Sequence, residues 1–251
     1  MKIASKSPFK RLMVSELAAG MGWGRSWRIG VLWAYFDESG THDSKTGNIT
    51  SLTLSGAIAT CDQWRSFDRK WAEVLDDAGL EWFHMTDFEA RSEPPYSDWT
   101  EKRRREILGN LLDAAVDHVP NVTGYHVDIK TTVQRGYEDI VAKLTKDWAI
   151  FTYGSKEPVT MILAHHPQYG AQRIARYFDL WNDDGLLNFG GIGHPKRLMP
   201  LQLADIIAYE MAREMRPVRP ETRRFPLKRL AEGCKSCTLT FVPYWDSTTA
   251  L

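Results

Sequence analysis

The chain has 251 residues, a length that suits one large domain, and its content of hydrophobic residues (43%) and charged residues (25%) is that of a globular protein. Lysine and arginine total 32, as do aspartate and glutamate, so the formal net charge is zero. This balance argues against a strong sequence-independent grip on nucleic acid, which depends on neutralising phosphates. No apolar run approaches the roughly 20 residues that cross a bilayer, so we expect no association with a membrane.

The first residues of the chain are expected to lie outside the folded domain. Residues 1–28 begin with a basic stretch, and Glu16 with several polar residues interrupts any apolar core of the signal-peptide kind. We predict a poorly ordered extension at 1–28 and a single domain at 29–251. The three cysteines include one CxxC pair, Cys234 and Cys237, which is too few for a disulfide framework or a four-ligand zinc site. This cysteine usage predicts a reducing, cytoplasmic location.

Two strands are predicted at the start of the domain. Residues 31–36 (VLWAYF) form a continuous apolar run, typical of a buried strand, and the run ends in Asp-Glu-Ser-Gly, which predicts a turn. Residues 49–59 alternate between apolar and polar, which predicts the second strand of an antiparallel pair.

The remaining elements follow from hydrophobic spacing. Residues 62–78 show apolar spacing of three and four, with Asp62 as the expected cap and Gly79 as the end. Further helices are predicted at 100–119, 131–150, 171–181 and 200–215, further strands at 122–129 and 159–164, a short strand at 81–84, and a glycine-rich loop at 182–195. This order predicts an α/β fold in which a mixed sheet is covered by helices on both faces.

Two acidic residues follow the first predicted strand. Asp37 and Glu38 stand at a strand end, where open α/β sheets bind ligands, and acids beside a core need a cation or hydrogen bonds. Because consecutive strand residues face opposite sides, Asp37 is favoured as the metal ligand, and Glu38 reaches in only if the turn begins at once. The alternative is an ordinary turn that the two acids cap.

The last predicted helix carries an acid at the edge of its apolar stripe. At roughly 100° per residue, Asp205 shares a face with Gln202, Tyr209 and Arg216, whereas Glu210 points well away from it. Asp205 could therefore meet another element at this rim, or it could simply be solvated. We expect Gln202 and Arg216 to contact a substrate from the same face.

Histidines and further acids form two more clusters. His84 and Asp87 lie in the segment FHMTD, and His165 and His166 follow the predicted strand 159–164. A histidine pair at a strand end can bind metal or shuttle protons, or it can be a surface pair. No phosphate loop of the Walker or dinucleotide type and no GxSxG nucleophile elbow occurs, which removes the commonest NTPase, dehydrogenase and hydrolase readings.

Three motifs occur in a recognisable order: YFDESG at 35–40, FHMTD at 83–87 and PLQLADIIAY at 200–209. In these motifs the chain resembles the family called domain of unknown function 3800, which is found widely in bacteria and phages. That family is regarded as ribonuclease-H-like, with a predicted nuclease activity. The resemblance covers roughly residues 31–215 and implies a ribonuclease-H-like mixed sheet flanked by helices on both faces.

Carried over position by position, the resemblance implies a catalytic role for Asp37, Glu38, His84, Asp87 and Asp205. No protein nucleophile stands among these residues, so the metal would have to supply the reactive water.

One feature departs from the family pattern. In related sequences the strand that here reads VTMILA (159–164) tends to end in an acid, whereas this chain has His165 and His166. The departure allows a site in which His166 joins Asp37 and Asp205 as a metal ligand, since imidazole suits transition metals such as Mn²⁺. It also allows a reduced or lost activity.

The expected function is a divalent-metal-dependent nuclease that hydrolyses the phosphodiesters of DNA or RNA with Mg²⁺ or Mn²⁺. Hard divalent cations prefer oxygen ligands, and paired ions can activate a water and stabilise the departing oxygen. The segment 213–229 holds seven basic and two acidic residues and would border the site and contact phosphates. Two alternatives remain: a non-catalytic binding or phage-defence module on the same fold, and a hydrolase of a small phosphorylated molecule, which zero net charge would suit.

Overall fold

A computed structural model describes residues 32–42, 49–128, 133–165, 171–181, 185–215 and 224–241 of the chain. Within these ranges the elements in chain order are β1 (Leu32–His42), β2 (Ile49–Thr60), α2 (Cys61–Ala78), α3 (Met85–Ala90), the short 3-10 helix η2 (Tyr96–Asp98), α4 (Glu101–His118), β3 (Asn121–Asp128), α5 (Val133–Ser155), β4 (Val159–Ala164), α6 (Ala171–Trp181), β5 (Leu187–Gly193), α7 (Met199–Glu214), α8 (Phe225–Gly233) and β6 (Ser236–Phe241). The extension predicted at 1–28 lies outside the described residues. None of the described helices is long and apolar enough to cross a membrane.

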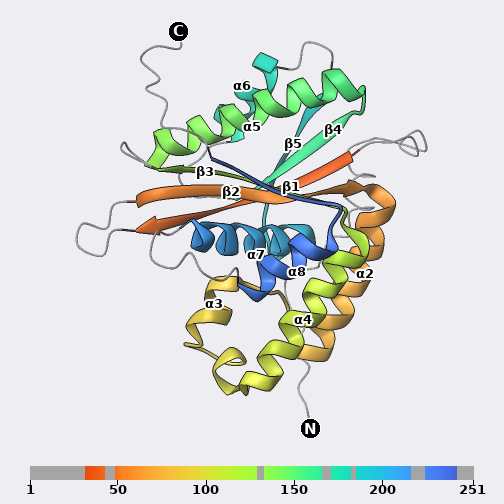
Figure 1. Cartoon of the computed structure of the whole chain (residues 1–251), viewed down its shortest axis with the longest axis vertical. Helices are drawn as coiled ribbons and strands as arrows, with labels where there is room; N and C mark the ends of the chain where they lie inside the picture. The colour runs from red at the N-terminus through yellow and green to blue at the C-terminus, as the bar shows by residue number, and fades with distance from the viewer. Residues whose placement is uncertain are drawn as a thin grey trace.

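The strands form one mixed sheet in the order β5-β4-β1-β2-β3-β6. Strand β2 pairs antiparallel with β1 and with β3, whereas the pairs β1–β4, β4–β5 and β3–β6 are parallel. Helices α5 and α6 lie on one side of this sheet, and α7, α8, α2, α3 and α4 lie on the other (Figure 1). The predicted α/β architecture, a mixed sheet with helices on both faces, is therefore confirmed.

Alternation along β1 decides which helices each residue meets. Ala34 and Phe36 belong to the core beneath α5 and α6, while Trp33 and Tyr35 belong to the core that includes α7 and α2. The indole N–H of Trp64 in α2 also donates a hydrogen bond to the carbonyl of Trp33 at 2.8 Å. The period of two in a strand therefore places the next odd residue of β1 on the side of α7.

Strand β1 runs further than the sequence predicts. The expected turn at residues 37–40 is wrong, because these residues continue the antiparallel pairing with β2 as far as His42. The parallel pairing with β4, by contrast, ends where Phe36 lies opposite Leu163. Beyond Phe36, β1 therefore keeps a neighbour on one side only, and the sheet opens towards the ends of β4 and β5.

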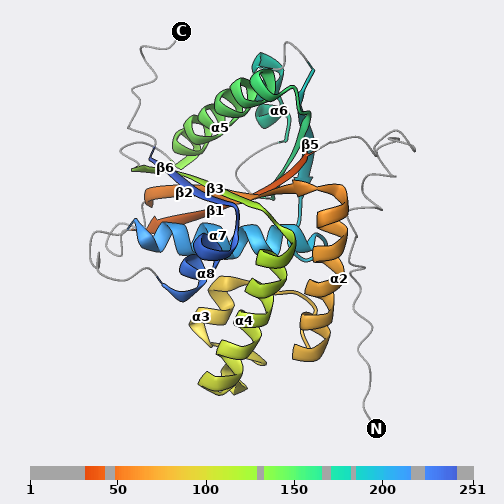
Figure 2. The same cartoon turned by 45° about the vertical axis from the view of Figure 1, so that its right-hand side comes forward.

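Helix α7 lies between the sheet and a second layer of helices, which the two views make plain (Figure 2). It buries thirteen of its sixteen residues, so the exposed rim expected for an amphipathic helix does not exist. Gly124 of β3 allows the close approach, since a Cβ atom there would stand 2.4 Å from the Sδ of Met211. An acid on this helix is consequently placed inside the molecule.

Three local predictions need correction. The helix α2 is capped by Thr60 rather than Asp62, because the Thr60 side chain accepts from the N–H of Gln63, and the Gln63 side chain accepts from the N–H of Thr60 at 2.9 Å. The short strand expected at 81–84 is irregular loop. The loop expected at 182–195 contains β5, which pairs with β4 as an edge strand despite its glycines.

Candidate active site

A cavity of about 510 Å³ opens where β1 outruns β4. Its lining comes from β1, from the loop before α3, from the ends of β4 and β5, and from α7. The residues that carry chemistry are Asp37, Glu38, His84, His165, His194 and Asp205, with Trp82 and Tyr209 as aromatic walls. Four residues predicted from separate motifs thus come together in one place.

Asp37 and Glu38 both line this cavity from β1, so the expectation that Glu38 reaches the site only if a turn begins at once is wrong. Asp37 Oδ1 accepts a hydrogen bond from the N–H of Glu38 at 2.8 Å. Burial raises the pKa of Asp37 well above its usual range, and the charges of Glu38 and Asp205 raise it further. Burial also raises the pKa of Glu38 to about 7. The two neighbouring carboxyls therefore compete for ionisation unless a cation relieves their repulsion.

Asp205 joins α7 to the loop that carries the middle motif. Its side chain is 8% exposed, and its Oδ2 accepts a hydrogen bond from the N–H of Met85 at 2.6 Å. Met85 is the first residue of α3, and the residue before it, His84, provides no side-chain cap. Asp205 therefore caps α3 from another helix. Burial raises the pKa of Asp205 to about 6, although His84 and the Met85 N–H lower it.

His84 and Asp87 act as an oriented pair. The Nδ1–H of His84 donates to Asp87 Oδ2 at 2.9 Å, which leaves Nε2 of a neutral imidazole as the proton acceptor. His84 lines the cavity, whereas Asp87 lines a neighbouring hollow. The ring of His84 also stacks on Trp82, with centroids 5.2 Å apart. Asp87 thus orients His84 and does not face the cavity itself.

His194 is a site residue that the sequence analysis missed. It follows β5 just as His165 follows β4, and the backbone N–H of His165 donates to the carbonyl of Gly193 at 2.7 Å. The two imidazole rings stack with centroids 6.3 Å apart. Burial lowers the pKa of His194, and the charges of Lys196 and His165 lower it further. The signal for His194 would have been its place after a strand, which the glycines of β5 concealed.

The role predicted for Gln202 needs correction. Its side chain is fully buried, and its Oε1 accepts from the Trp71 indole at 2.9 Å and from the Phe83 N–H at 3.0 Å. Its Nε2 donates to the carbonyl of Pro195 at 2.9 Å. Gln202 therefore ties the loops bearing His84 and His194 to α7 and does not present its amide to a substrate.

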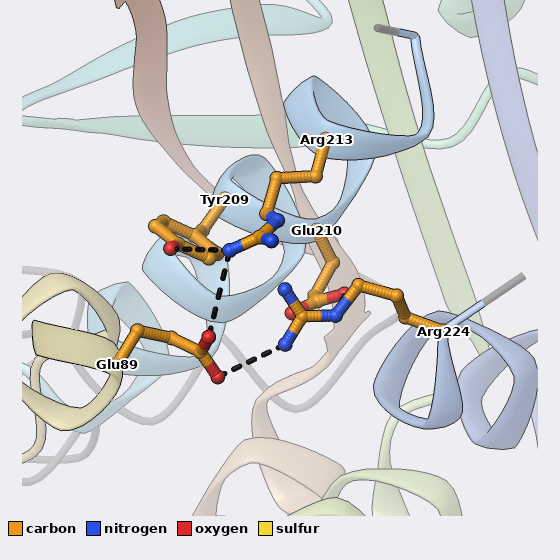
Figure 3. A network of polar contacts seen from close by, with 5 residues as sticks. All are labelled: Glu89, Tyr209, Glu210, Arg213 and Arg224. Carbon is orange, nitrogen blue, oxygen red and sulfur yellow. Dashed lines mark hydrogen bonds and ion pairs between the residues drawn. The ribbon is translucent and has the colours of Figure 1, made fainter. Parts of the chain in front are cut away.

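The described part of the basic segment is engaged within the protein. Arg213 donates to the Tyr209 hydroxyl at 2.9 Å and pairs with Glu89 at 3.5 Å, while Arg224 bridges Glu89 at 2.9 Å and Glu210 at 3.3 Å (Figure 3). These contacts join α7 to α3 and α8. The bond from Arg213 also holds the hydroxyl of Tyr209, which lines the cavity.

Two predicted site residues, His166 and Arg216, lie outside the described residues. Arg229, further along the segment, is itself paired with Asp113 at 2.7 Å. Arg213, Arg224 and Arg229, which we expected to contact phosphates, thus each pair with an acid of the protein itself.

The donor set of the cavity fits a hard divalent cation. Carboxylate oxygens of Asp37, Glu38 and Asp205 line it, and such oxygens are the ligands that Mg²⁺ prefers. Among the described residues, no group of three or more His, Cys, Asp or Glu side chains converges as a ready-made metal cage. Mg²⁺ commonly binds through one or two carboxylates and completes its shell with water and substrate phosphate, so the arrangement suits that mode.

Three comparisons were made with known proteins. No protein-family model matches the chain, and no curated protein and no solved structure matches it either.

Proposed function

We propose that the chain is a divalent-metal-dependent nuclease with a ribonuclease-H-like core, related to the domain of unknown function 3800 family. The strand order supports the core: β1, β2 and β3 form an antiparallel series, and β4 and β5 extend it in parallel beside β1. The position of the first acid on the central strand, facing a late helix that carries another acid, supports the family relation. The partner is nucleic acid, and the cofactor is Mg²⁺ or Mn²⁺.

The observation that carries this proposal is the meeting of three carboxylates from β1 and α7 in one cavity. Burial and mutual repulsion disfavour their ionised forms, as the raised pKa values of Asp37, Glu38 and Asp205 express. Asp37 and Asp205 would hold the cation together with water and a substrate phosphate oxygen, and the cation would supply an activated water and charge stabilisation of the departing oxygen.

The remaining residues suit phosphodiester hydrolysis. His84 lines the cavity and is oriented by Asp87 through Nδ1, so its Nε2 is available to accept or donate a proton. His165 and His194 stand at the ends of adjacent parallel strands, where their N–H groups can contact a phosphate oxygen. No Ser or Cys nucleophile is required.

The test is metal-dependent cleavage by the purified chain on single-stranded DNA, duplex DNA, RNA and hybrid substrates. Cleavage should require Mg²⁺ or Mn²⁺ and stop on chelation. Asp37→Asn and Asp205→Asn keep the shape of each side chain while removing a ligand charge. Each should cost more activity than the roughly 10–100-fold loss that follows removal of an outer-shell partner. Asn at 205 can still accept from Met85, so α3 should stay capped.

Asp62→Asn is the matched control, because the Asp62 side chain is 89% exposed on α2. It should leave cleavage unchanged. Full activity in both site variants would assign the cleavage to another protein or another site. If the wild type cleaves none of the substrates with either metal, the non-catalytic binding module becomes the better reading.

One observation favours the small-substrate alternative. Arg213, Arg224 and Arg229, the arginines of the basic segment that the structure describes, are paired with acids within the protein, which leaves these three less free to contact a long phosphate backbone. Cleavage rates measured on oligonucleotides of increasing length separate the two readings. The cleavage rate of a nuclease should rise with oligonucleotide length until the strand fills its binding site, whereas a small-molecule phosphohydrolase should be fastest on mononucleotides.

A further inference from the structure

The neighbouring hollow that Asp87 lines has a volume of about 470 Å³ and adjoins the acidic cavity. Trp82 lines both spaces, so this residue belongs to their common wall. The hydrogen bond from His84 to Asp87 also links the two spaces, because His84 lines the cavity and Asp87 lines the hollow. A ligand that fills one space therefore lies next to the other.

The floor of the hollow is rigid. Tyr96 is buried, and its ring packs edge-on against Phe83, Phe88 and Trp99 with centroids 6.2, 6.0 and 5.2 Å apart. The Tyr96 hydroxyl also accepts from the backbone N–H of His84 at 3.4 Å. Side chains packed in this way keep a partly apolar surface in place before a ligand arrives, which lowers the entropy cost of binding.

The charges around the hollow select against phosphate. Glu81, Asp87 and Glu93 line it, so an anionic group is repelled. An uncharged ring that carries an amino group is favoured instead, because carboxylates accept hydrogen bonds from the exocyclic amines of bases. Positive charge lies nearby, because the ammonium of Lys196 is 4.9 Å from the centre of the Trp82 ring and Arg197 follows Lys196 in sequence.

We propose that this hollow binds the base of a nucleotide whose phosphate lies at the acidic cavity, with the base against Trp82 and its exocyclic amino group on the carboxylates. The inference rests on the proposed function and deepens it. The substrate is a single strand, since a paired base cannot present its face and its Watson–Crick edge to a pocket. Adenine and cytosine are preferred to thymine and uracil, which offer a carbonyl oxygen where the others offer an amine.

The proposal is tested by fluorescence anisotropy with short labelled oligo-dC, oligo-dA and oligo-dT. Binding is measured in the Asp37→Asn chain with Mg²⁺, so that the oligonucleotides stay intact. Oligo-dC and oligo-dA should bind more tightly than oligo-dT. Adding Trp82→Leu should weaken oligo-dC binding by roughly tenfold, because stacking on an aromatic side chain contributes about 1–3 kcal/mol per base. Trp82→Phe should retain most of the affinity, and Glu93→Gln should narrow the preference for oligo-dC over oligo-dT.

Phe225→Leu is the control, because Phe225 is an exposed aromatic residue (55%) on α8, away from both spaces. It should leave all affinities unchanged, and thermal melting checks that each variant is folded. Equal binding of the three oligonucleotides, or an unchanged affinity in folded Trp82→Leu, overturns the proposal.

Cleavage by the wild type separates this inference from the proposed function. Metal-dependent cleavage that ignores both Trp82 and base identity overturns the base site and leaves the nuclease standing. Binding that depends on Trp82 and selects amino-bearing bases, in a chain that cleaves nothing, supports the base site and overturns the nuclease.

Discussion

Single polar side chains hold the site together by joining segments that are far apart in sequence. Asp205 caps α3 through the N–H of Met85, and Gln202 satisfies the Trp71 indole and the Phe83 N–H while donating to the carbonyl of Pro195. Each of these groups is costly to bury without a partner. The two residues of α7 therefore differ in role: Asp205 lines the cavity, and Gln202 fixes the loops around it.

Replacing Gln202 should destabilise the fold before it affects any chemical step. Gln202→Leu keeps the volume but leaves an indole N–H, a backbone N–H and a carbonyl without their partner, at a cost of roughly 1–3 kcal/mol for each buried group. We expect a loss of about 3 kcal/mol or more in the free energy of unfolding, measured by urea titration. Gln172→Leu, at an exposed position of α6, should change it by less than about 0.5 kcal/mol. Equal effects of the two changes would contradict the tethering role of Gln202.

At the scale of elements, α7 is connected to α3 and α8 by the ion-pair network of Figure 3. Glu210 is its buried member, with a side chain that is fully inaccessible, and Arg224 is its ion-pair partner at 3.3 Å. Burial raises the pKa of Glu210 from its ordinary 4.5 to about 7, while Arg224 lowers it and Glu89 raises it. The desolvation of the carboxylate thus outweighs the attraction of the arginine.

This network gives stability a defined dependence on pH. Between pH 4.5 and about 7 the folded state holds the Glu210 proton that the unfolded chain has released, so stability falls as the pH rises through this window. The glutamine of Glu210→Gln cannot ionise, so the variant should not lose this part of its unfolding free energy as the pH rises. Relative to the wild type, the variant should therefore gain up to roughly 3 kcal/mol of unfolding free energy between the two ends of the window. Denaturant titrations at several pH values measure the difference, and parallel curves for the two proteins would contradict it.

At the scale of the whole molecule, the formal charge is balanced in total, and several arginines are paired with acids within the fold. The chain has as many acidic as basic residues, and Arg213, Arg224 and Arg229 are paired with acids within the fold. The described residues that line the acidic cavity include no lysine or arginine, and the ammonium of Lys196 lies 4.9 Å from the centre of the ring of Trp82, one of the lining residues. A nucleic acid bound here is consequently held by few phosphate contacts.

Binding of a single-stranded oligonucleotide should therefore depend only weakly on salt. Each phosphate contact to a single strand contributes about −0.7 to the slope of log K against log salt concentration, so one or two contacts give a slope between about −0.7 and −1.4. Anisotropy titrations over a range of KCl concentrations measure this slope. A slope of about −4 or steeper would show an extended basic track and would contradict the balanced surface.

The sequence by itself determined the parts of this protein that depend on local periodicity. Strand β4 and helix α6 lie where their patterns predict, at 159–164 and 171–181, because apolar residues at strand or helix spacing must bury one face. The acids of the first and last motifs were also identified from sequence, Asp37 by its place after an apolar run and Asp205 by its place on the last predicted helix. Their meeting in one cavity agrees with what the family resemblance implies.

Only the tertiary structure decided the features that depend on long-range partners. The continuation of β1 past Phe36 is imposed by pairing with β2, and the edge strand β5 forms on β4 although its glycines carry no alternating pattern. His194 becomes a site residue through that pairing, and Gln202 becomes internal because α7 is covered on both sides. The spacing of apolar residues in the sequence shows which face of a strand or helix is buried. Hydrogen bonds between strands and between buried side chains, however, join residues that are far apart in the sequence, and no local pattern predicts such pairs.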